Sequence, residues 1–214
     1  MRKDLIDKTI SLYTTVGWKR WFSRIRFWDA PYIETEKLVP SKGTIVDLGC
    51  GEGIFTNFLA LSSKQRKIVG IELNKERVSQ ADRRLTNVSF KKGDATKVAI
   101  PKADCIILFH LLHHLLSFKD QEKVIARCAR ALAKRGKLII VEVNVKPTFK
   151  YLVSWFTDHF VVPFLFDKKF YESDIYFRKI ADWKKLFAKY NLGCEVILAE
   201  KNKPFSHVIF VIQR

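Results

Sequence analysis

The feature that most constrains this chain is an alternation of short apolar segments with helix-like segments, which begins at Thr44. The apolar segments are near-continuous runs, typical of strands that are covered on both faces of a sheet. They occupy residues 44–49, 67–73, 88–93, 103–110 and 137–144. Strands that alternate with helices predict βαβ units with right-handed crossovers and a parallel sheet. The sequence therefore predicts an α/β fold.

Two of the intervening segments carry clear helix signals. Residues 74–85 open with Asn74, a favourable N-cap. Residues 119–136 place apolar side chains at i, i+3 and i+4 spacing, and they end in basic residues and Gly136, which is typical of a helix C-terminus. We expect a helix over each range.

The C-terminal part of the chain continues the pattern with a change of direction. Residues 179–191 predict a helix, and residues 194–200 and 206–213 predict two further strands. The five residues between these strands, KNKPF, are typical of a hairpin loop. The sheet is therefore expected to end with an antiparallel pair.

Composition places the chain among ordinary globular domains. It has 214 residues, of which 48% are hydrophobic and 29% charged, and this excludes a disordered, collagen-like or coiled-coil chain. There are 39 basic and 22 acidic residues, a net charge of +17 that is spread along the chain. Such a charge favours an anionic partner, either nucleic acid or an anionic lipid surface, and it is equally compatible with a solvated basic surface.

Cysteine usage and hydropathy predict a cytoplasmic protein. The four cysteines form no CxxC pattern, which favours reduced thiols. The N-terminal segment MRKDLIDKTI carries charge without a long apolar core, so we expect no signal peptide. No apolar run reaches the roughly 20 residues that a membrane-spanning helix needs.

A glycine-rich loop carries the chemistry. Residues 46–53 read VDLGCGEG and join the first strand to a helix. Glycines there let the backbone turn sharply and approach a ligand at the carboxyl end of a parallel strand. The spacing is G-x-G-x-G rather than the dinucleotide pattern, and Asp47 and Glu52 would repel a pyrophosphate. The loop therefore suits a ligand that carries positive charge.

Two further acids follow the next strands. Glu72 ends the second strand, where a carboxylate can accept hydrogen bonds from both ribose hydroxyls. Asp94 follows the third strand, where a carboxylate can accept from a purine amine. Together with Asp47, these acids describe an adenosine ligand without phosphates.

With these motifs the chain resembles the class I S-adenosylmethionine-dependent methyltransferases. VDLGCGEG matches the first motif of that family, GIELN the second-strand acid, KKGDA the third-strand acid and DCIILFHLLHHL the fourth-strand motif. The resemblance is close over residues 43–145. It implies a Rossmann-like, doubly wound seven-stranded sheet, mostly parallel with an antiparallel last strand.

The resemblance also implies S-adenosyl-L-methionine as the cofactor. The positions that would bind it are Asp47, Gly49, Cys50, Gly51, Glu72, Leu73, Asp94, Ala95, Phe109 and His110. The first four would hold the methionine end, the next two the ribose and the pair after the third strand the adenine. The last two would line the cofactor near its methyl group.

Histidines after the fourth strand are the candidates for a general base. Histidine titrates near neutral pH and suits this role. Of the three in HLLHH, His110 and His114 are the candidates for a catalytic base, although a structural or cofactor-packing role is the favoured interpretation of these histidines. His113 completes the set, and Asp158-His159 is a second candidate pair. No carboxylate accompanies the three histidines at ligand spacing, so we expect no metal.

Two aromatic-rich segments flank the predicted cofactor core. Residues 1–32 hold seven of the 28 aromatic residues and residues 149–177 hold eleven. We therefore divide the chain into an N-terminal helical extension or lid over 1–42 and a methyltransferase domain over 43–214. Within that domain, 146–178 is an inserted segment that covers the acceptor. An aromatic lid favours a small hydrophobic or lipid-like acceptor.

Other partners follow from the same residues. Basic side chains alternate with Trp18, Trp21 and Trp28, as in an interfacial helix that makes peripheral contact with an anionic membrane. The same residues fit an ordinary lid helix that packs on the core equally well. Aromatic and basic residues together also hold single-stranded RNA, so an RNA or protein methyltransferase is the less favoured alternative. An alternative of another class is a non-catalytic cofactor-binding partner subunit.

Overall fold

The computed structural model describes residues 2–14, 16–145, 175–201 and 203–213. In these ranges seven strands form one sheet in the order β3-β2-β1-β4-β5-β7-β6. The strands are β1 (Gly43–Leu48), β2 (Arg66–Glu72), β3 (Val88–Lys92), β4 (Ala103–Phe109), β5 (Leu132–Val143), β6 (Gly193–Leu198) and β7 (His207–Gln213). β1 to β5 pair in parallel, and β7 is antiparallel to both β5 and β6. The predicted doubly wound α/β fold, with its antiparallel last strand, is confirmed.

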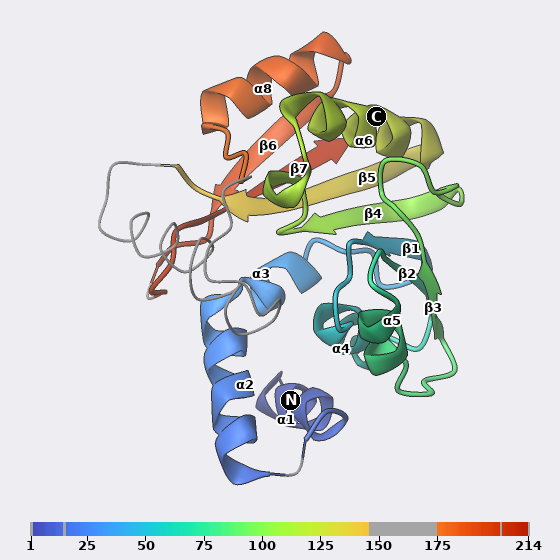
Figure 1. The fold of residues 1–214 in the computed structure, drawn as a ribbon, viewed down its shortest axis with the longest axis vertical. Coiled ribbons are helices and arrows are strands. Elements are labelled where there is room, and N and C mark those ends of the chain that lie inside the picture. The colour runs from blue at the N-terminus through green and yellow to red at the C-terminus, as the bar shows by residue number, and fades with distance from the viewer. Residues whose placement is uncertain (1, 15, 146–174, 202, 214) are drawn as a thin grey trace.

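Helices cover both faces of the sheet (Figure 1). The described helices are α1 (Arg2–Ser11), α2 (Gly17–Asp29), α3 (Tyr32–Glu36), α4 (Ile54–Ser62), α5 (Lys75–Ala81), the 3₁₀ turn η1 (Leu112–His114), α6 (Phe118–Ala131) and α8 (Ile180–Lys189). α6 and α8 pack on one face, and α1 to α4 pack on the other. None of these helices is both long and apolar enough to cross a membrane.

The continuous apolar runs follow from this two-sided cover. In β4, Ile106 and Leu108 pack against the core under α6 and α8, whereas Cys105 and Ile107 pack against the core under α1 to α4. All four side chains are fully buried. Because successive side chains of a strand point to opposite faces, a strand with cover on both faces is apolar at every position.

The helices predicted over 74–85 and 119–136 end earlier than expected. α6 ends at Ala131, and Leu132 is already extended and pairs with Ala103 on β4. The chain then turns through Arg135, whose φ is +65°, into the long part of β5. Leu132 therefore fits the apolar helical period but is buried by the sheet. α5 ends at Ala81 rather than at residue 85, although Asn74 caps it as predicted, accepting from the backbone N–H groups of Glu76 and Arg77.

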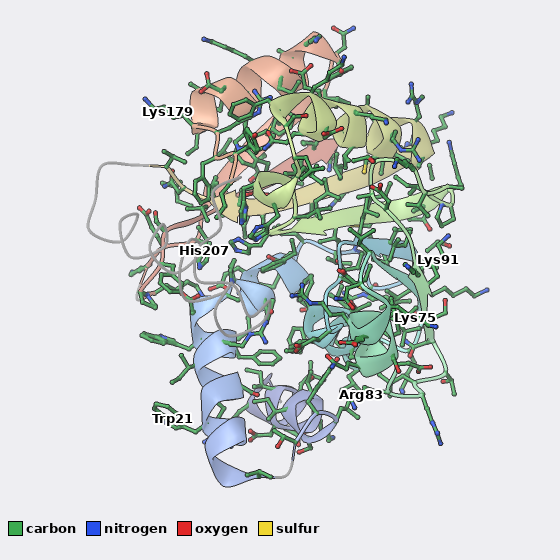
Figure 2. All side chains as sticks on the ribbon, viewed as in Figure 1. Trp21, Lys75, Arg83, Lys91, Lys179 and His207 are labelled. Atoms are coloured by element: carbon green, nitrogen blue, oxygen red, sulfur yellow. The ribbon has the colours of Figure 1, made fainter. Side chains whose placement is uncertain are left out.

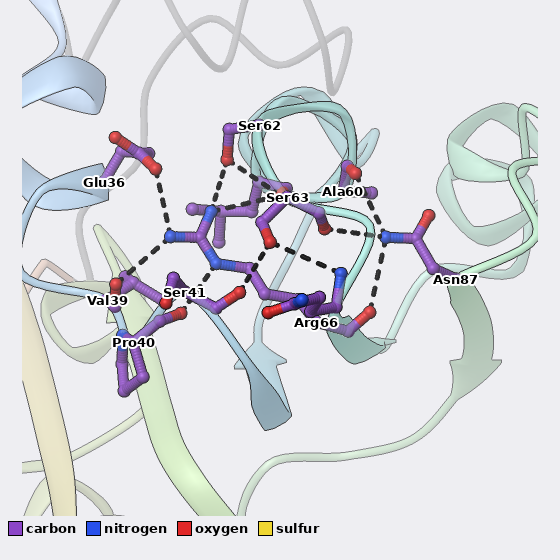
Figure 3. A network of polar contacts seen from close by, with 11 residues as sticks. Glu36, Val39, Pro40, Ser41, Ala60, Ser62, Ser63, Arg66 and Asn87 are labelled. Atoms are coloured by element: carbon purple, nitrogen blue, oxygen red, sulfur yellow. Dashed lines mark hydrogen bonds and ion pairs between the residues drawn. The ribbon is translucent and has the colours of Figure 1, made fainter.

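Arg66 of β2 is almost fully buried and joins α3 and α4 to the sheet (Figure 3). Its guanidinium donates to the carbonyl oxygens of Val39 (3.1 Å), Pro40 (2.7 Å) and Leu59 (3.1 Å) and to the Ser62 hydroxyl. It also lies 3.0 Å from the carboxylate of Glu36 at the end of α3. The division of the chain at residue 42 stays a prediction, and most of the predicted insertion, 146–178, lies outside the described residues.

Candidate active site

The glycine loop after β1 is shaped by three residues with positive φ. Gly49, Gly51 and Gly53 have φ of +80°, +55° and +73°. A Cβ atom at Gly49 would lie 2.6 Å from Leu111, and one at Gly53 would lie 2.7 Å from Ala81. At Gly51 a Cβ atom would meet nothing within 4 Å. The loop is therefore closely packed at both ends and faces open space at its middle, as a cradle for a ligand requires.

Glu72 at the end of β2 fixes this loop. One of its carboxylate oxygens accepts from the Gly51 N–H at 3.0 Å, and the other accepts from the Asn74 N–H at 2.9 Å. The N–H groups of Gly49 and Cys50 donate to the Ile71 carbonyl at 2.7 and 3.1 Å. The predicted residues Asp47, Gly49, Cys50, Gly51 and Glu72 are thus brought together at one end of β1 and β2.

Asp47 is buried, and only one of its two carboxylate oxygens has a hydrogen-bond partner. Oδ2 accepts from the Thr56 hydroxyl at 2.6 Å, whereas Oδ1 has no hydrogen-bond partner. Burial raises the pKa of Asp47 to about 6; the hydrogen bond from Thr56 opposes this shift, and the charge of Glu72 adds to it. A buried carboxylate with a free oxygen fits the positive charge that the sequence predicts for the ligand.

Three further predicted cofactor positions follow β2 and β3. Asp94 follows β3 and accepts from the N–H and the hydroxyl of Thr96 at 2.8 and 2.7 Å, and this hydroxyl bond is the largest cause that lowers the pKa of Asp94. Ala95 is buried, but Leu73 is 61% exposed. The Gly93 N–H donates to the Glu72 carbonyl at 2.9 Å, so the ends of β2 and β3 are adjacent.

The N-terminal helices contact the glycine loop, which the sequence does not predict. The Tyr13 hydroxyl, just after α1, donates to the Glu52 carbonyl at 2.9 Å and accepts from Asn57 at 2.6 Å. Arg26 of α2 lies 3.8 Å from the Glu52 carboxylate. Burial raises the pKa of Tyr13 to about 12, so the phenol stays protonated and donates. No local pattern signals a contact between residues so far apart in the sequence.

His110 follows β4 and lies at the centre of a group of rings. Its φ is +51°, and its N–H donates to the Val141 carbonyl at 2.9 Å. Ring centroids lie 5.2 Å away in Phe109, 5.7 Å in His113 and 5.1 Å in His207. Burial among these rings holds the pKa of His110 well below its usual value, and the neighbouring histidines add to the shift. The imidazole is therefore neutral at physiological pH.

His113 is in contact with a buried carboxylate. Its Nδ1 lies 2.5 Å from Glu142 Oε2, and both side chains are almost fully buried. The other oxygen of Glu142 accepts from the Leu112 N–H at 2.9 Å. His114, by contrast, is exposed. The sequence included His113 among three histidines, but Glu142 was missed; its only signal is a charged residue within an apolar strand.

The segment that begins at residue 175 covers His113. The Phe177 ring stacks on the imidazole with centroids 5.2 Å apart, and the Tyr176 N–H donates to the His113 carbonyl at 2.8 Å. Gln121 of α6 donates to the carbonyls of Leu112 and Tyr176 and so joins η1 to this segment. Asp158 and His159 lie outside the described residues.

A second pair of imidazole and carboxylate lies beside His110, whose ring centroid is 5.1 Å from that of His207. His207 begins β7, and its Nε2 lies 3.4 Å from Oδ1 of Asp29 at the end of α2. The sequence predicted neither residue, because they are brought together only by the fold. Among the described residues, no group of three or more His, Cys, Asp or Glu side chains is arranged to hold a metal ion.

Comparison with known proteins decides what this arrangement is. Residues 45–136 match the family model of a methyltransferase domain. The match includes the glycine loop, both following acids, and the strand and helix that bracket the histidines. Over residues 45–136 the arrangement is therefore that of a methyltransferase domain.

Relatives of this methyltransferase domain are similar in part of their length. Indole glucosinolate O-methyltransferase 5 from Arabidopsis thaliana is 34% identical over 46% of this chain and 26% of its own length. The chain spans less than half the length of the curated relatives it matches.

Solved structures resemble the domain in fold. Magnesium protoporphyrin IX methyltransferase from Synechocystis PCC 6803, with bound SAH, has a TM-score of 0.69 at 15% identity and covers 100% of both chains. Human N-acetylserotonin methyltransferase, in complex with SAM, has a TM-score of 0.67 at 15% identity and covers 92% of this chain and 55% of its own. At these identities the likeness is one of fold.

Proposed function

We propose that this chain transfers the methyl group of S-adenosylmethionine to a protonated oxygen or nitrogen atom of a small hydrophobic acceptor. The observation that carries the proposal is the cradle at the ends of β1 and β2. It is open at Gly51 and has a buried carboxylate oxygen on Asp47 without a partner. The match of residues 45–136 to a methyltransferase domain supports the same activity.

The residues that would bind the cofactor have distinct parts. Asp47 and the open loop at Gly51 would take the charged methionine end, Glu72 the ribose hydroxyls and Asp94 the adenine amine. Phe109 and His110, at the end of β4, would lie beside the reacting methyl group. When bound, the cofactor supplies a methyl group activated by a sulfonium. The protein then aligns the acceptor with it and excludes water.

Of the histidines at this edge, His113 is the best suited to act as general base. Its contact with Glu142 orients the ring and stabilises the imidazolium that forms when the other nitrogen, Nε2, takes the proton of the acceptor. His110 lies closer to the centre, but its lowered pKa makes it a weak base. His114 is exposed and therefore less suited to the role that the sequence predicted for it.

The acceptor is proposed to be hydrophobic because aromatic rings surround the site. Tyr32 and Phe55 each lie 5.0 Å from Phe109, centroid to centroid, and Phe27 lies 5.1 Å from Tyr32. Relatives act, by their names, on indole glucosinolates, N-acetylserotonin and magnesium protoporphyrin IX, and this supports a small-molecule acceptor.

Two measurements test the proposed function. Titration calorimetry with S-adenosylhomocysteine should show saturable binding at one site per chain. Purified chain with methyl-labelled S-adenosylmethionine should then label a product from hydroxylated aromatic, quinone or lipid fractions. Binding without turnover on any fraction would favour a non-catalytic cofactor-binding subunit, and no binding would contradict the proposal.

We further propose that α2 rests on an anionic membrane and brings the site to a lipid-like acceptor. Trp21 and Trp28 lie seven residues apart on one helix face and are 67% and 56% exposed, and Val16 before the helix is 46% exposed. Figure 2 shows Trp21 pointing away from α1. Exposed tryptophans on a strongly basic chain are typical of interfacial binding.

Vesicle flotation tests this placement. At low salt the chain should float with vesicles that contain phosphatidylglycerol and not with pure phosphatidylcholine vesicles. Replacing both Trp21 and Trp28 by serine should abolish flotation, because each replacement removes an aromatic ring that the membrane interface would bury. Leu198→Ser, at a residue 50% exposed on β6, is the matched control. Failure of the wild-type chain to float, with RNA binding that falls steeply with salt, would favour an RNA acceptor instead.

A further inference from the structure

His207 has a position that the proposed mechanism does not use. It opens β7 and pairs with Val143, the last residue of β5. Because β7 is antiparallel to β5, its first residue lies at the sheet edge where β4 and β5 end, which is the edge that carries His113 and Glu142. Figure 2 labels His207 between the ends of these strands and α3.

Asp29 decides which nitrogen of His207 carries the proton. Oδ1 of Asp29 lies 3.4 Å from His207 Nε2 and also accepts from the Phe205 N–H at 3.3 Å. A carboxylate accepts hydrogen bonds and does not donate them, so Nε2 is the protonated nitrogen in the neutral ring. Nδ1 then has a lone pair and is a hydrogen-bond acceptor.

This acceptor nitrogen has no partner in the described structure. Nδ1 of His207 is buried and makes no hydrogen bond, and only 3% of the residue is exposed. Buried polar atoms in folded proteins almost always have a partner, and an exception points to a ligand or water that completes the site. The missing partner must be a donor, an O–H or N–H group.

The position of His207 indicates which molecule carries this donor group. The His110 ring adjoins both His207 and His113, with centroids at 5.1 and 5.7 Å. His207 is therefore near enough to contact another part of a molecule whose reactive atom is at His113. Phe205, in the loop before β7, lies beside His207 with ring centroids 6.4 Å apart.

We propose that His207 Nδ1 binds a second hydroxyl or amine of the methyl acceptor, at a distance from the atom that is methylated. The inference rests on the proposed function and narrows its acceptor to hydrophobic compounds with at least two hydrogen-bond donors. His207 is thus a binding residue that selects the acceptor, and Asp29 positions it.

Two amide variants separate the two nitrogens of His207. In His207→Gln the amide reaches the position of Nε2, keeps a donor to Asp29 and removes the acceptor. In His207→Asn the amide reaches the position of Nδ1 and restores an acceptor there. The probe is phenol, the simplest aromatic O–H donor, added with saturating S-adenosylhomocysteine and observed by ¹⁵N resonances of labelled histidine.

The wild-type chain should show His207 protonated at Nε2 only, and phenol should shift the Nδ1 resonance saturably. Loss of one neutral hydrogen bond should weaken phenol binding about tenfold in His207→Gln, with His207→Asn closer to wild type. Affinity for S-adenosylhomocysteine should be unchanged in both variants.

Several results would overturn the inference. They are a proton on Nδ1 in the wild-type chain, no saturable shift up to the solubility limit of phenol, or equal loss of binding in both amide variants. Absence of S-adenosylhomocysteine binding in the wild-type chain would instead contradict the proposed function, so the two failures are distinguishable.

Discussion

Asp47 shows how a single residue of the proposed cofactor site lowers the stability of the chain when no ligand is bound. Its carboxylate is buried, one oxygen lacks a partner, and its pKa is raised to about 6 from a usual value of 3.8. The folded chain therefore holds this proton more tightly than the unfolded chain. Asp47 costs no stability below about pH 4, and the penalty grows as the pH rises through the interval up to about 6.

Asp47→Asn should stabilise the chain without cofactor at pH 7. The shift corresponds to about 3 kcal/mol, at about 1.4 kcal/mol per pKa unit, and the amide removes the buried charge. The measurement is urea unfolding at pH 4 and pH 7, and the gain should appear only at the higher pH. The same variant should lose affinity for S-adenosylmethionine, and equal stability of the two chains at pH 7 would contradict the account of Asp47.

Gly51 is the position in the proposed cofactor cradle where an added Cβ atom would contact no other part of the protein. Gly51→Val should abolish S-adenosylhomocysteine binding in calorimetry and leave the chain folded, at a cost of about 1–2 kcal/mol for its φ of +55°. Asp94→Ala should also abolish binding. Gly193→Val is the control, because a Cβ atom there also meets nothing within 4 Å. Unchanged affinity in either site variant would show that the cofactor binds elsewhere.

His113 and Glu142 make a prediction about rate. His113→Gln should lower kcat by about 10²–10⁴-fold with cofactor affinity unchanged, since it removes the base but not the cradle. Glu142→Gln should lower kcat less and shift the pH profile, because the imidazolium loses its carboxylate. Lys119→Ala, exposed at the start of α6, is the control. Full activity of His113→Gln would return the role of base to His110 or His114.

At the scale of elements, Arg66 holds α3, the entry to β1 and the end of α4 in one network. Arg66→Met should lower the free energy of unfolding by about 3 kcal/mol, because it leaves buried carbonyl groups without donors and Glu36 without its cation. Arg24→Met, which breaks an exposed pair with Asp7, should cost less than about 1 kcal/mol. Thermal or urea unfolding compares them, and similar losses would show that burial of Arg66 is not what matters.

The ends of elements were predicted less well than the elements themselves. The apolar period of α6 continues through Leu132, so the sequence gives no sign that this residue leaves the helix. Pairing with Ala103 on β4 decides it, and that partner lies almost thirty residues earlier in the chain. Boundaries of this kind depend on competition between a local helix and a distant strand.

For the molecule as a whole, the N-terminal helices and the β6–β7 hairpin approach the same site from opposite ends of the chain. Lys203 donates to the carbonyl of Trp28 at 2.9 Å, beside the contact of Asp29 with His207. Tyr13 and Arg26 reach the glycine loop. The proposed cofactor cradle and the proposed acceptor side are therefore both completed by residues outside the region that matches the family.

The local sequence by itself determined the order of strands and helices, the glycine loop and the acids that follow β1, β2 and β3, because apolar period, glycine spacing and charge act over a few residues. The tertiary structure alone decided that His113 meets Glu142, that His207 meets Asp29 and that Tyr13 meets the loop. Each of these contacts joins residues far apart in the chain, and only packing of the two cores against one sheet brings them within reach.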